Sequence, residues 1–251
     1  MAVLDHPIFT ASIALIRQEL AARGSGDPAL AARLQALSPL ERDVLERCIH
    51  SSGDPSLVDG LCFGPALAAC RQGLAALAAG APILCDTDMA AAAVAPMARR
   101  TRGNRVLCLL DWAPATAPSG STRSAAAVVP AWSALTAAQT HRSGMAPVVL
   151  IGSAPTALEQ LLDLVAAGAP APSLLIGMPV GFVGVAESKR RLATSGLAQI
   201  RLDGSRGGAG LVAAACNALL RATHTAPADA ETSTATATAK GTGESEGSGA
   251  V

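Results

Sequence analysis

The chain contains no tyrosine and few other aromatic residues, with three phenylalanines and two tryptophans among 251 residues. Mechanisms that need a tyrosine acid, nucleophile or radical are therefore excluded. Proteins that bind single-stranded nucleic acid stack its bases on aromatic side chains, so this scarcity argues strongly against such a platform. Half of the residues are hydrophobic, and the core must be built from aliphatic side chains.

The chain also lacks net charge, long apolar runs and an export signal. Nineteen Lys and Arg are balanced by 19 Asp and Glu, and the sequence pI is about 6.9. Nucleic-acid-binding domains usually have a pI above about 9, so we expect no nucleic-acid partner. No apolar run approaches the roughly 20 residues of a membrane span, and the start lacks the basic and apolar segments of a signal peptide. We therefore expect a cytoplasmic protein without a membrane partner.

Closely spaced cysteine pairs of the kind that bind zinc are missing as well, because the six cysteines form no CxxC motif. We expect no metal site. In a cytoplasmic protein the thiols stay reduced, and most of these cysteines lie within apolar runs. They are expected to be small buried hydrophobic residues. Their positions are 48, 62, 70, 85, 108 and 216.

Length and composition predict one domain followed by a tail. Residues 222–251 are rich in Thr, Ala, Gly, Ser and Glu and contain almost no large apolar side chain. Such a segment cannot bury enough surface to offset its ordering entropy. We predict that it is disordered and that residues 1–221 form a single domain. A second loose stretch, within residues 22–38, is expected to be a loop between helices.

The middle of the chain alternates short apolar runs with longer segments rich in Ala and Leu. Nearly continuous apolar runs are typical of strands covered on both faces, and repeated strand–helix alternation predicts a parallel sheet with right-handed crossovers. We predict an α/β fold: three α/β/α layers, a mainly parallel five-stranded sheet and an N-terminal helical addition. The expected strands are 82–86, 104–110, 147–152, 173–177 and 198–202. The expected helices are 8–22, 39–52, 64–79, 87–98, 122–138, 154–167, 185–195 and 207–222.

His50 is the best-placed candidate for acid–base chemistry. It ends an amphipathic segment, ERDVLERCIH, and is followed by Ser51, Ser52 and Gly53. A histidine near a helix C-terminus is favoured in its protonated form, because it faces the negative end of the helix dipole. It is then a proton donor near neutral pH. The alternative is that His50 only caps its helix.

Two segments are candidates for binding anions. Gly120 to Ser124, with Ser121, Thr122 and Arg123 between them, opens a helix and offers hydroxyls, backbone N–H groups and a guanidinium. The alternative is an ordinary helix cap beside a solvated arginine. The loop 204–210, which contains Arg206, resembles a phosphate cradle only loosely and matches no nucleotide-binding fingerprint.

Two further loops follow expected strands, at the edge of a parallel sheet where ligands bind. Asp86 and Asp88 are either an acid–base pair or, for Asp86, a cap for the following helix. Gly181 lies in a glycine-rich turn that permits close backbone approach to a ligand.

Several of these segments occur together in one known family. PILCDTDM at 82–89, GSAPTALEQLLDL at 152–164 and LLIGMPVGFVGVAESK at 174–189 closely resemble the precorrin-8X methylmutases of cobalamin biosynthesis. GSTRSAAA at 120–127, RGGAG at 206–210, IHSSGD at 49–54 and HPIFTASIALIRQEL at the N-terminus match further blocks of that family. The resemblance covers about residues 6–222 in unbroken order.

This resemblance implies an α/β homodimer with its active site at the dimer interface. It implies an isomerase that moves a methyl group from carbon 11 to carbon 12 of a corrinoid macrocycle, either precorrin-8X or its cobalt complex, without an external cofactor. His50 aligns with the catalytic histidine, as proton donor to the ring. Ser12 aligns with a substrate-contacting serine, and its alternative is a helix cap or a surface residue. The expected substrate-binding residues are Ser12, Asp86, Ser121, Thr122, Arg123, Ser124, Gly181 and Arg206.

The sequence departs from the family pattern at four positions. Ala11 and Ala92 replace an arginine and a histidine, Ser121 replaces an asparagine, and Asp111 stands where an arginine is usual. Two lost cations would weaken binding of the substrate carboxylates. A non-catalytic corrinoid carrier is therefore the alternative function. A nucleotide-binding protein is a third interpretation, which rests only on the glycine-rich loops.

Overall fold

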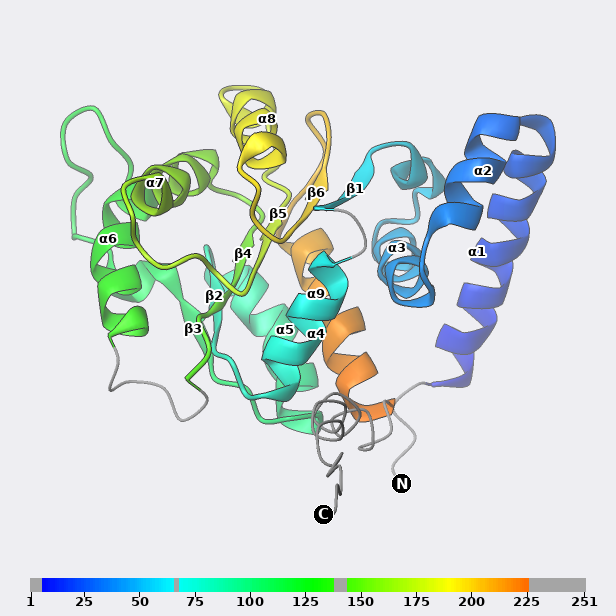
Figure 1. The fold of residues 1–251 in the computed structure, drawn as a ribbon, viewed down its shortest axis with the longest axis horizontal. Coiled ribbons are helices and arrows are strands. Elements are labelled where there is room, and N and C mark those ends of the chain that lie inside the picture. Colours follow the sequence, from blue (N-terminus) through cyan, green and yellow to red (C-terminus); the bar gives the residue numbers. More distant parts are fainter. Residues whose placement is uncertain (1–5, 66–67, 138–143, 226–251) are drawn as a thin grey trace, which may run out of the picture.

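A computed structural model of the chain describes residues 6–65, 68–137 and 144–225, arranged around one sheet (Figure 1). The strand order is β1-β6-β5-β4-β2-β3, and every neighbouring pair is parallel except β1 with β6. The expected α/β fold and its five parallel strands are confirmed, and a sixth strand is added. The strands are β1 (Leu61–Gly64), β2 (Ile83–Cys85), β3 (Val106–Cys108), β4 (Val148–Ile151), β5 (Leu174–Gly177) and β6 (Gln199–Leu202).

Strand β1 corrects the sequence-based assignment, which began a helix at residue 64. Leu61–Gly64 pairs antiparallel with β6, with Leu61 opposite Leu202. This edge strand is four residues long and exists because of a pairing with residues far along the chain. A local pattern carries no sign of such a contact. The expected helix begins at Ala69 instead.

Helices cover both faces of the sheet. One layer consists of α4 (Ala69–Ala78), α5 (Asp88–Arg100) and α9 (Ala209–Thr225), and the other of α6 (Arg123–Thr136), α7 (Pro155–Ala166) and α8 (Val185–Thr194). Each face has its own cluster of buried aliphatic side chains. The predicted three-layer arrangement is therefore confirmed. Two short 3-10 helices, η1 (Pro55–Asp59) and η2 (Leu109–Trp112), follow α3 and β3.

Three N-terminal helices lie beside the β1 edge of the sheet in Figure 1: α1 (Pro7–Gly26), α2 (Pro28–Ala36) and α3 (Pro39–Ser52). The prediction of a loop within residues 22–38 is wrong. Helix α1 continues to Gly26, where Gly24 packs closely on Ala31 of α2. Asp27 then caps α2, whose first residue is Pro28. A cap residue followed by proline is a helix start, although the same residues also occur in loops.

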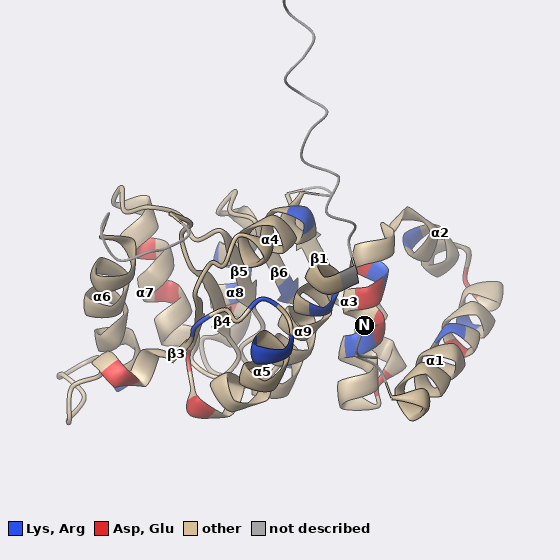
Figure 2. Ribbon diagram, turned by 90° about the horizontal axis from the view of Figure 1, so that it is seen from below, with Lys and Arg blue, Asp and Glu red and all other residues tan. Residues whose placement is uncertain are grey.

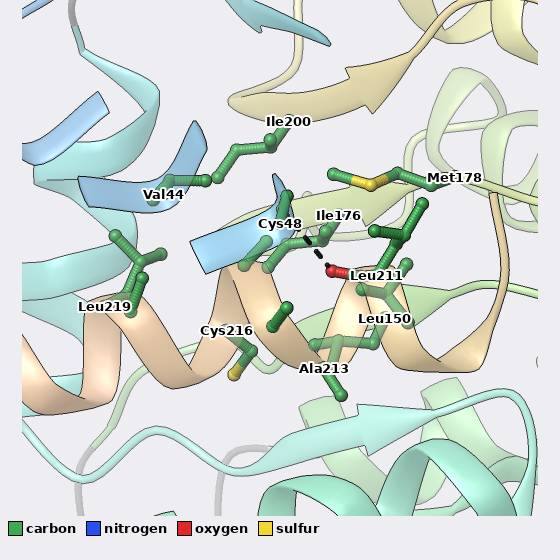
Figure 3. Close-up of a cluster of buried hydrophobic side chains, with 14 of the residues drawn as sticks. Val44, Cys48, Leu150, Ile176, Met178, Ile200, Leu211, Ala213, Cys216 and Leu219 are labelled. Atoms are coloured by element: carbon green, nitrogen blue, oxygen red, sulfur yellow. Dashed lines mark hydrogen bonds between the residues drawn. The ribbon is translucent and has the colours of Figure 1, made fainter. Parts of the chain in front are cut away.

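The larger core cluster lies between α3, α9 and the sheet. The Cys48 Sγ of α3 lies 3.8 Å from the Leu211 carbonyl oxygen of α9, and Val44, Leu150 and Ile176 belong to the same cluster (Figure 3). All six cysteines are free, and five are buried as predicted. Burial raises the pKa of Cys48 and of Cys216 to about 12, so both stay protonated thiols near neutral pH.

The C-terminal helix is longer than predicted. Helix α9 runs to Thr225, so the first four residues of the expected tail are helical. The other residues for which we predicted disorder, 226–251, lie outside the described residues.

Charge of both signs is spread over the fold. Helix α3 carries acidic and basic residues, and α7 carries acidic ones (Figure 2). Within the described residues, no helix combines the length and hydropathy that a membrane crossing requires.

Candidate active site

The loops that follow β4, β5 and β6 pack against one another at the carboxyl edge of the sheet. The N–H of Gly208 donates to the carbonyl of Met178 at 2.9 Å, and the N–H of Val180 donates to the carbonyl of Gly152 at 3.1 Å. A Cβ on Gly207 would lie 2.0 Å from the Met178 carbonyl oxygen. The glycine-rich loop 204–208 is therefore tied to its neighbour by its own backbone. This is not the arrangement of an open phosphate cradle.

His50 lies in the last turn of α3, and its ring is exposed. Ser38 and Glu41 begin this helix with a capping box, and Gly53 ends it in the left-handed conformation at φ 70°. The chain itself thus fixes both ends of the helix that carries the imidazole. The N–H of Gly53 caps the helix through the carbonyl of Ile49, so the cap does not use the His50 side chain.

Ser12 and Phe9, both on α1, hold the His50 ring. The Ser12 Oγ lies 2.8 Å from His50 Nδ1, at hydrogen-bonding distance. The Phe9 ring meets the imidazole edge-on, with centroids 5.0 Å apart and planes at 86°. Ser12 lies within α1, whose cap is His6, so the alternative that Ser12 is a helix cap is wrong. A fixed partner on Nδ1 leaves Nε2 as the nitrogen for substrate.

Arg206 is engaged within the chain. Its Nη1 donates to the Asp54 carboxylate at 2.7 Å and to the Ser56 Oγ at 2.6 Å. The hydroxyl of Ser56, followed by its N–H and the Arg206 guanidinium, keeps the pKa of Asp54 below its usual range. Sequence analysis placed Arg206 among the substrate-binding residues, and the structure places it in this ion pair.

Lys189 was not among the predicted site residues. Its side chain is buried, and Nζ donates to the carbonyls of Gly204 and Arg206, both at 2.7 Å. Burial lowers the pKa of Lys189 to about 8, although the charge of Asp203 opposes this shift. Its partners lie 15 and 17 residues along the chain, so local sequence gave no signal of this contact.

Asp86 directly follows β2 and is only 1% exposed. Its Oδ2 accepts from the backbone N–H groups of Gly152, Ser153 and Ala154, at 3.0, 2.6 and 2.9 Å. Burial raises its pKa, and the three N–H groups oppose that shift. The prediction that Asp86 caps α5 is wrong, because Thr87 caps that helix. Asp88, by contrast, is exposed in the first turn of α5.

These contacts predict two different outcomes at position 86. Asp86→Ala removes the acceptor of three backbone N–H groups, one buried and two partly buried, and should lower the free energy of unfolding by about 3 kcal/mol or more. Asp86→Asn keeps an acceptor and should lose less than about half as much. Urea unfolding measures both. An equal loss in both variants would show that the three hydrogen bonds are not what stabilises this loop.

The raised pKa of Asp86 adds a pH dependence to this comparison. A carboxyl that binds its proton more tightly when folded stabilises the fold at low pH, and this contribution is lost as pH rises through the raised pKa. Wild type should therefore gain stability relative to Asp86→Asn as the pH is lowered towards the ordinary aspartate pKa of about 3.9.

The second candidate group lies where α6 and α7 begin. Thr122 caps α6, and its Oγ1 lies 3.2 Å from the Ser124 Oγ and 2.7 Å from the Thr156 Oγ1. Arg123 is exposed and uses Nε to bond the Pro114 carbonyl. Ser121 is exposed beside them. Thr122 is thus the cap of α6, and its hydroxyl also forms a cluster with those of Ser124 and Thr156, of which sequence analysis missed Thr156.

Gly181 lies in the loop after β5, at φ 139°. Its N–H donates to the carbonyl of Ser205 at 3.0 Å, which joins this loop to the loop after β6. The next two side chains, Phe182 and Val183, are 94% and 89% exposed. This pinned loop therefore presents two apolar side chains to the outside.

The candidate residues fall into two groups along one edge. Ser12, His50, Arg206 and Gly181 lie towards the β6 end, and residues 121–124 lie beside α7, towards the β3 end. Four strand spacings of about 4.8 Å separate β6 from β3, which makes this part of the edge about 19 Å wide. Such an edge is wide enough for a broad ligand that contacts both groups.

The four departures from the family pattern lie at exposed positions, namely Ala11, Ala92, Asp111 and Ser121. Ala11 precedes Ser12 on α1, and Asp111 lies in η2 after β3. Within the described residues, no group of three or more His, Cys, Asp or Glu side chains is arranged to hold a metal ion.

Comparisons with known proteins point to one family. The family model described as precorrin-8X methylmutase matches residues 7–222. A precorrin-8X methylmutase of Pseudomonas aeruginosa is 48% identical over 69% of this chain and 80% of its own length. One from Sinorhizobium is 41% identical over 86% and 94%. A cobalt-precorrin-8 methylmutase of Synechocystis is 31% identical over 88% and 97%. The crystal structure of the Thermus thermophilus precorrin-8X methylmutase superposes with a TM-score of 0.70 at 34% identity, covering 87% of this chain and 96% of that one.

Proposed function

This chain belongs to the precorrin-8X methylmutase family and is an isomerase of cobalamin biosynthesis, and from this premise we propose that it moves a methyl group from carbon 11 to carbon 12 of precorrin-8X. The product would be hydrogenobyrinic acid. The observation that carries the proposal is the exposed His50 ring, held by Ser12 and Phe9 at the sheet edge.

The proposed reaction is a 1,5-sigmatropic shift. The bond from the methyl group to carbon 11 breaks as its bond to carbon 12 forms, and no group leaves the molecule. Such a shift needs neither a nucleophile nor a redox centre. Our proposed role for His50 is to donate a proton to the conjugated ring, which polarises it, and to recover that proton afterwards. Ser12 on Nδ1 would direct the other ring nitrogen to the substrate.

Carboxylate recognition is assigned to the second group of residues. The macrocycle carries acetate and propionate side chains. Arg123 is exposed at the start of α6, beside the hydroxyls of Thr122 and Ser124 and next to Ser121. A guanidinium and a helix N-terminus both favour carboxylates. In this proposal Arg123 binds one substrate carboxylate while His50 acts on the ring.

A homodimer with a shared active site is part of the proposal. His50 and Arg123 are both exposed in the single chain, so water would reach a bound macrocycle. Exposed apolar side chains, including Ile8 and Leu15 on α1 and Phe182 on the β5 loop, provide surface for a second copy. The free, mostly buried thiols suit a cytoplasmic enzyme.

The metal-free corrinoid is the proposed substrate, because the relatives at 48% and 41% identity are named precorrin-8X methylmutases. The relative at 31% identity is named for the cobalt form. The test mixes the protein with precorrin-8X and, separately, with its cobalt complex. An isomerase changes the visible spectrum while the pigment mass stays the same. Binding without any spectral change with either pigment would contradict the proposal and indicate a carrier.

A further inference from the structure

Arg206 joins two segments that are far apart in the sequence. Its guanidinium contacts Asp54 and Ser56 through hydrogen bonds of 2.6 and 2.7 Å and a longer one of 3.4 Å to the Ser56 carbonyl. Asp54 also accepts from the N–H and the hydroxyl of Ser56, at 2.9 and 2.6 Å. The turn after α3 and the loop after β6 are thus connected by several polar contacts.

Hydrogen bonds from Lys189 and to Met178 hold the backbone of the loop that carries Arg206. Lys189 is 2% exposed and donates to the carbonyls of Gly204 and of Arg206 itself. On the other side of the loop, the N–H of Gly208 bonds the Met178 carbonyl. The backbone from which Arg206 extends therefore has little freedom to move. The cation that holds this backbone is Lys189 of α8.

The partner of Arg206 lies just after the helix that carries His50. Asp54 follows Gly53, the left-handed residue that ends α3. The neighbouring residue Ser51 also lies close to α9, since a Cβ built on Gly210 would be 3.8 Å from the Ser51 Oγ. The end of α3 is therefore held between the β6 loop and the start of α9.

From these contacts we infer that Arg206 and Lys189 are positioning residues, which hold the C-terminal turn of α3 so that the His50 ring meets the macrocycle in the reactive orientation. This inference rests on the proposed role of His50. It replaces the sequence-based assignment of Arg206 to a substrate carboxylate, because the guanidinium is already bonded to Asp54 and Ser56. Lys189 acts through the loop backbone, and Arg206 acts through the turn at 54–56.

The two roles give opposite kinetic signatures. An arginine that binds a substrate carboxylate contributes to ground-state binding, so its loss raises KM. A residue that orients the acid contributes to the chemical step, so its loss lowers kcat. Arg123 provides the matched contrast, because it is an exposed arginine on the same edge with a proposed carboxylate-binding role.

The experiment compares Arg206→Gln, Arg206→Lys and Arg123→Gln in steady-state turnover of precorrin-8X. We expect Arg206→Gln to lower kcat by about 10- to 100-fold, since a misplacement of about 1 Å can cost about 100-fold, with KM within about twofold of wild type. Arg206→Lys keeps the charge that faces Asp54 and should recover part of kcat. Arg123→Gln should chiefly raise KM. A raised KM with unchanged kcat in Arg206→Gln would overturn the inference.

A second readout does not require turnover. The ring signals of His50 can be assigned in nitrogen-labelled protein by their absence from His50→Ala. We expect Arg206→Gln and Lys189→Met to shift these signals and Arg123→Gln to leave them in place. Unmoved signals in both variants would overturn the inference, whether or not the protein turns over either pigment. If wild type fails to convert both pigments while the signals still shift, the proposed function fails and the positioning contact stands.

Discussion

Replacing His50 with alanine should lower kcat for precorrin-8X by about 100- to 10,000-fold, the range that a positioned general acid contributes. KM should change little, because the carboxylates of the substrate are assigned to residues near the start of α6. Folding should be unaffected, because the imidazole is exposed and Gly53, rather than His50, caps α3. The loss would therefore fall on the chemical step.

The measurement is the rate of spectral change at saturating pigment, with circular dichroism to confirm that each variant is folded. Ser12→Ala is the matched comparison. It removes the partner of Nδ1, 2.8 Å from the ring, while the acid itself remains. Its kcat should fall by only about 10-fold, because orientation is lost and the proton donor is kept. Comparing the two variants separates the contribution of the His50 acid to kcat from that of Ser12, which orients it.

A different pattern would contradict the proposed mechanism. If His50→Ala kept more than about a tenth of the wild-type kcat, proton donation by this ring would not be the main contribution to catalysis. Enclosure and shaping of the macrocycle would then carry the rate. Ser12→Ala falling as far as His50→Ala would instead indicate that the serine hydroxyl itself contacts the substrate.

Much of the fold follows from local sequence pattern. The apolar runs that became β2, β4 and β5 are bounded by turn residues, and such runs signal buried parallel strands wherever they occur. Strand β1 carries no such pattern, because it is a short edge strand that exists through its pairing with β6. Helix α2 was missed for another reason: Asp27 and Pro28 fit a loop as well as a helix start, and packing of Gly24 on Ala31 decides between them.

The candidate site shows the same division. The positions of His50 and Thr122 at helix ends were predicted because helix ends have local signatures. The roles of Arg206 and Asp86 were not found, because their hydrogen-bond partners lie at least 150 and at least 66 residues away in the chain. A charged side chain looks the same in sequence whether it faces a ligand or an internal partner. Lys189 is the clearest example, since it lies on a polar helix and the fold buries it.

A large loss of stability is expected from a single methyl group added to the loop after β6. A Cβ on Gly207 would lie 2.0 Å from the carbonyl oxygen of Met178, 2.7 Å from its carbon and 2.9 Å from the carbonyl carbon of Pro179. These are backbone atoms at the end of β5, so no side chain can rotate away to make room. The loops after β5 and β6 would have to separate, which would also strain the bond from Gly208 to Met178.

Gly207→Ala should therefore lower the free energy of unfolding by about 3 kcal/mol or more, at the upper end of the cost of overpacking. Gly210→Ala, three residues along the chain, is the control. A Cβ there meets nothing closer than the Ser51 Oγ at 3.8 Å, and α9 has already begun at Ala209. Alanine favours a helix over glycine by up to about 1 kcal/mol, so this change should be neutral or stabilising. Urea unfolding of both variants decides the matter. Equal stabilities would mean that the loop after β6 moves freely against β5, and a loop that moves freely could not hold the turn after His50.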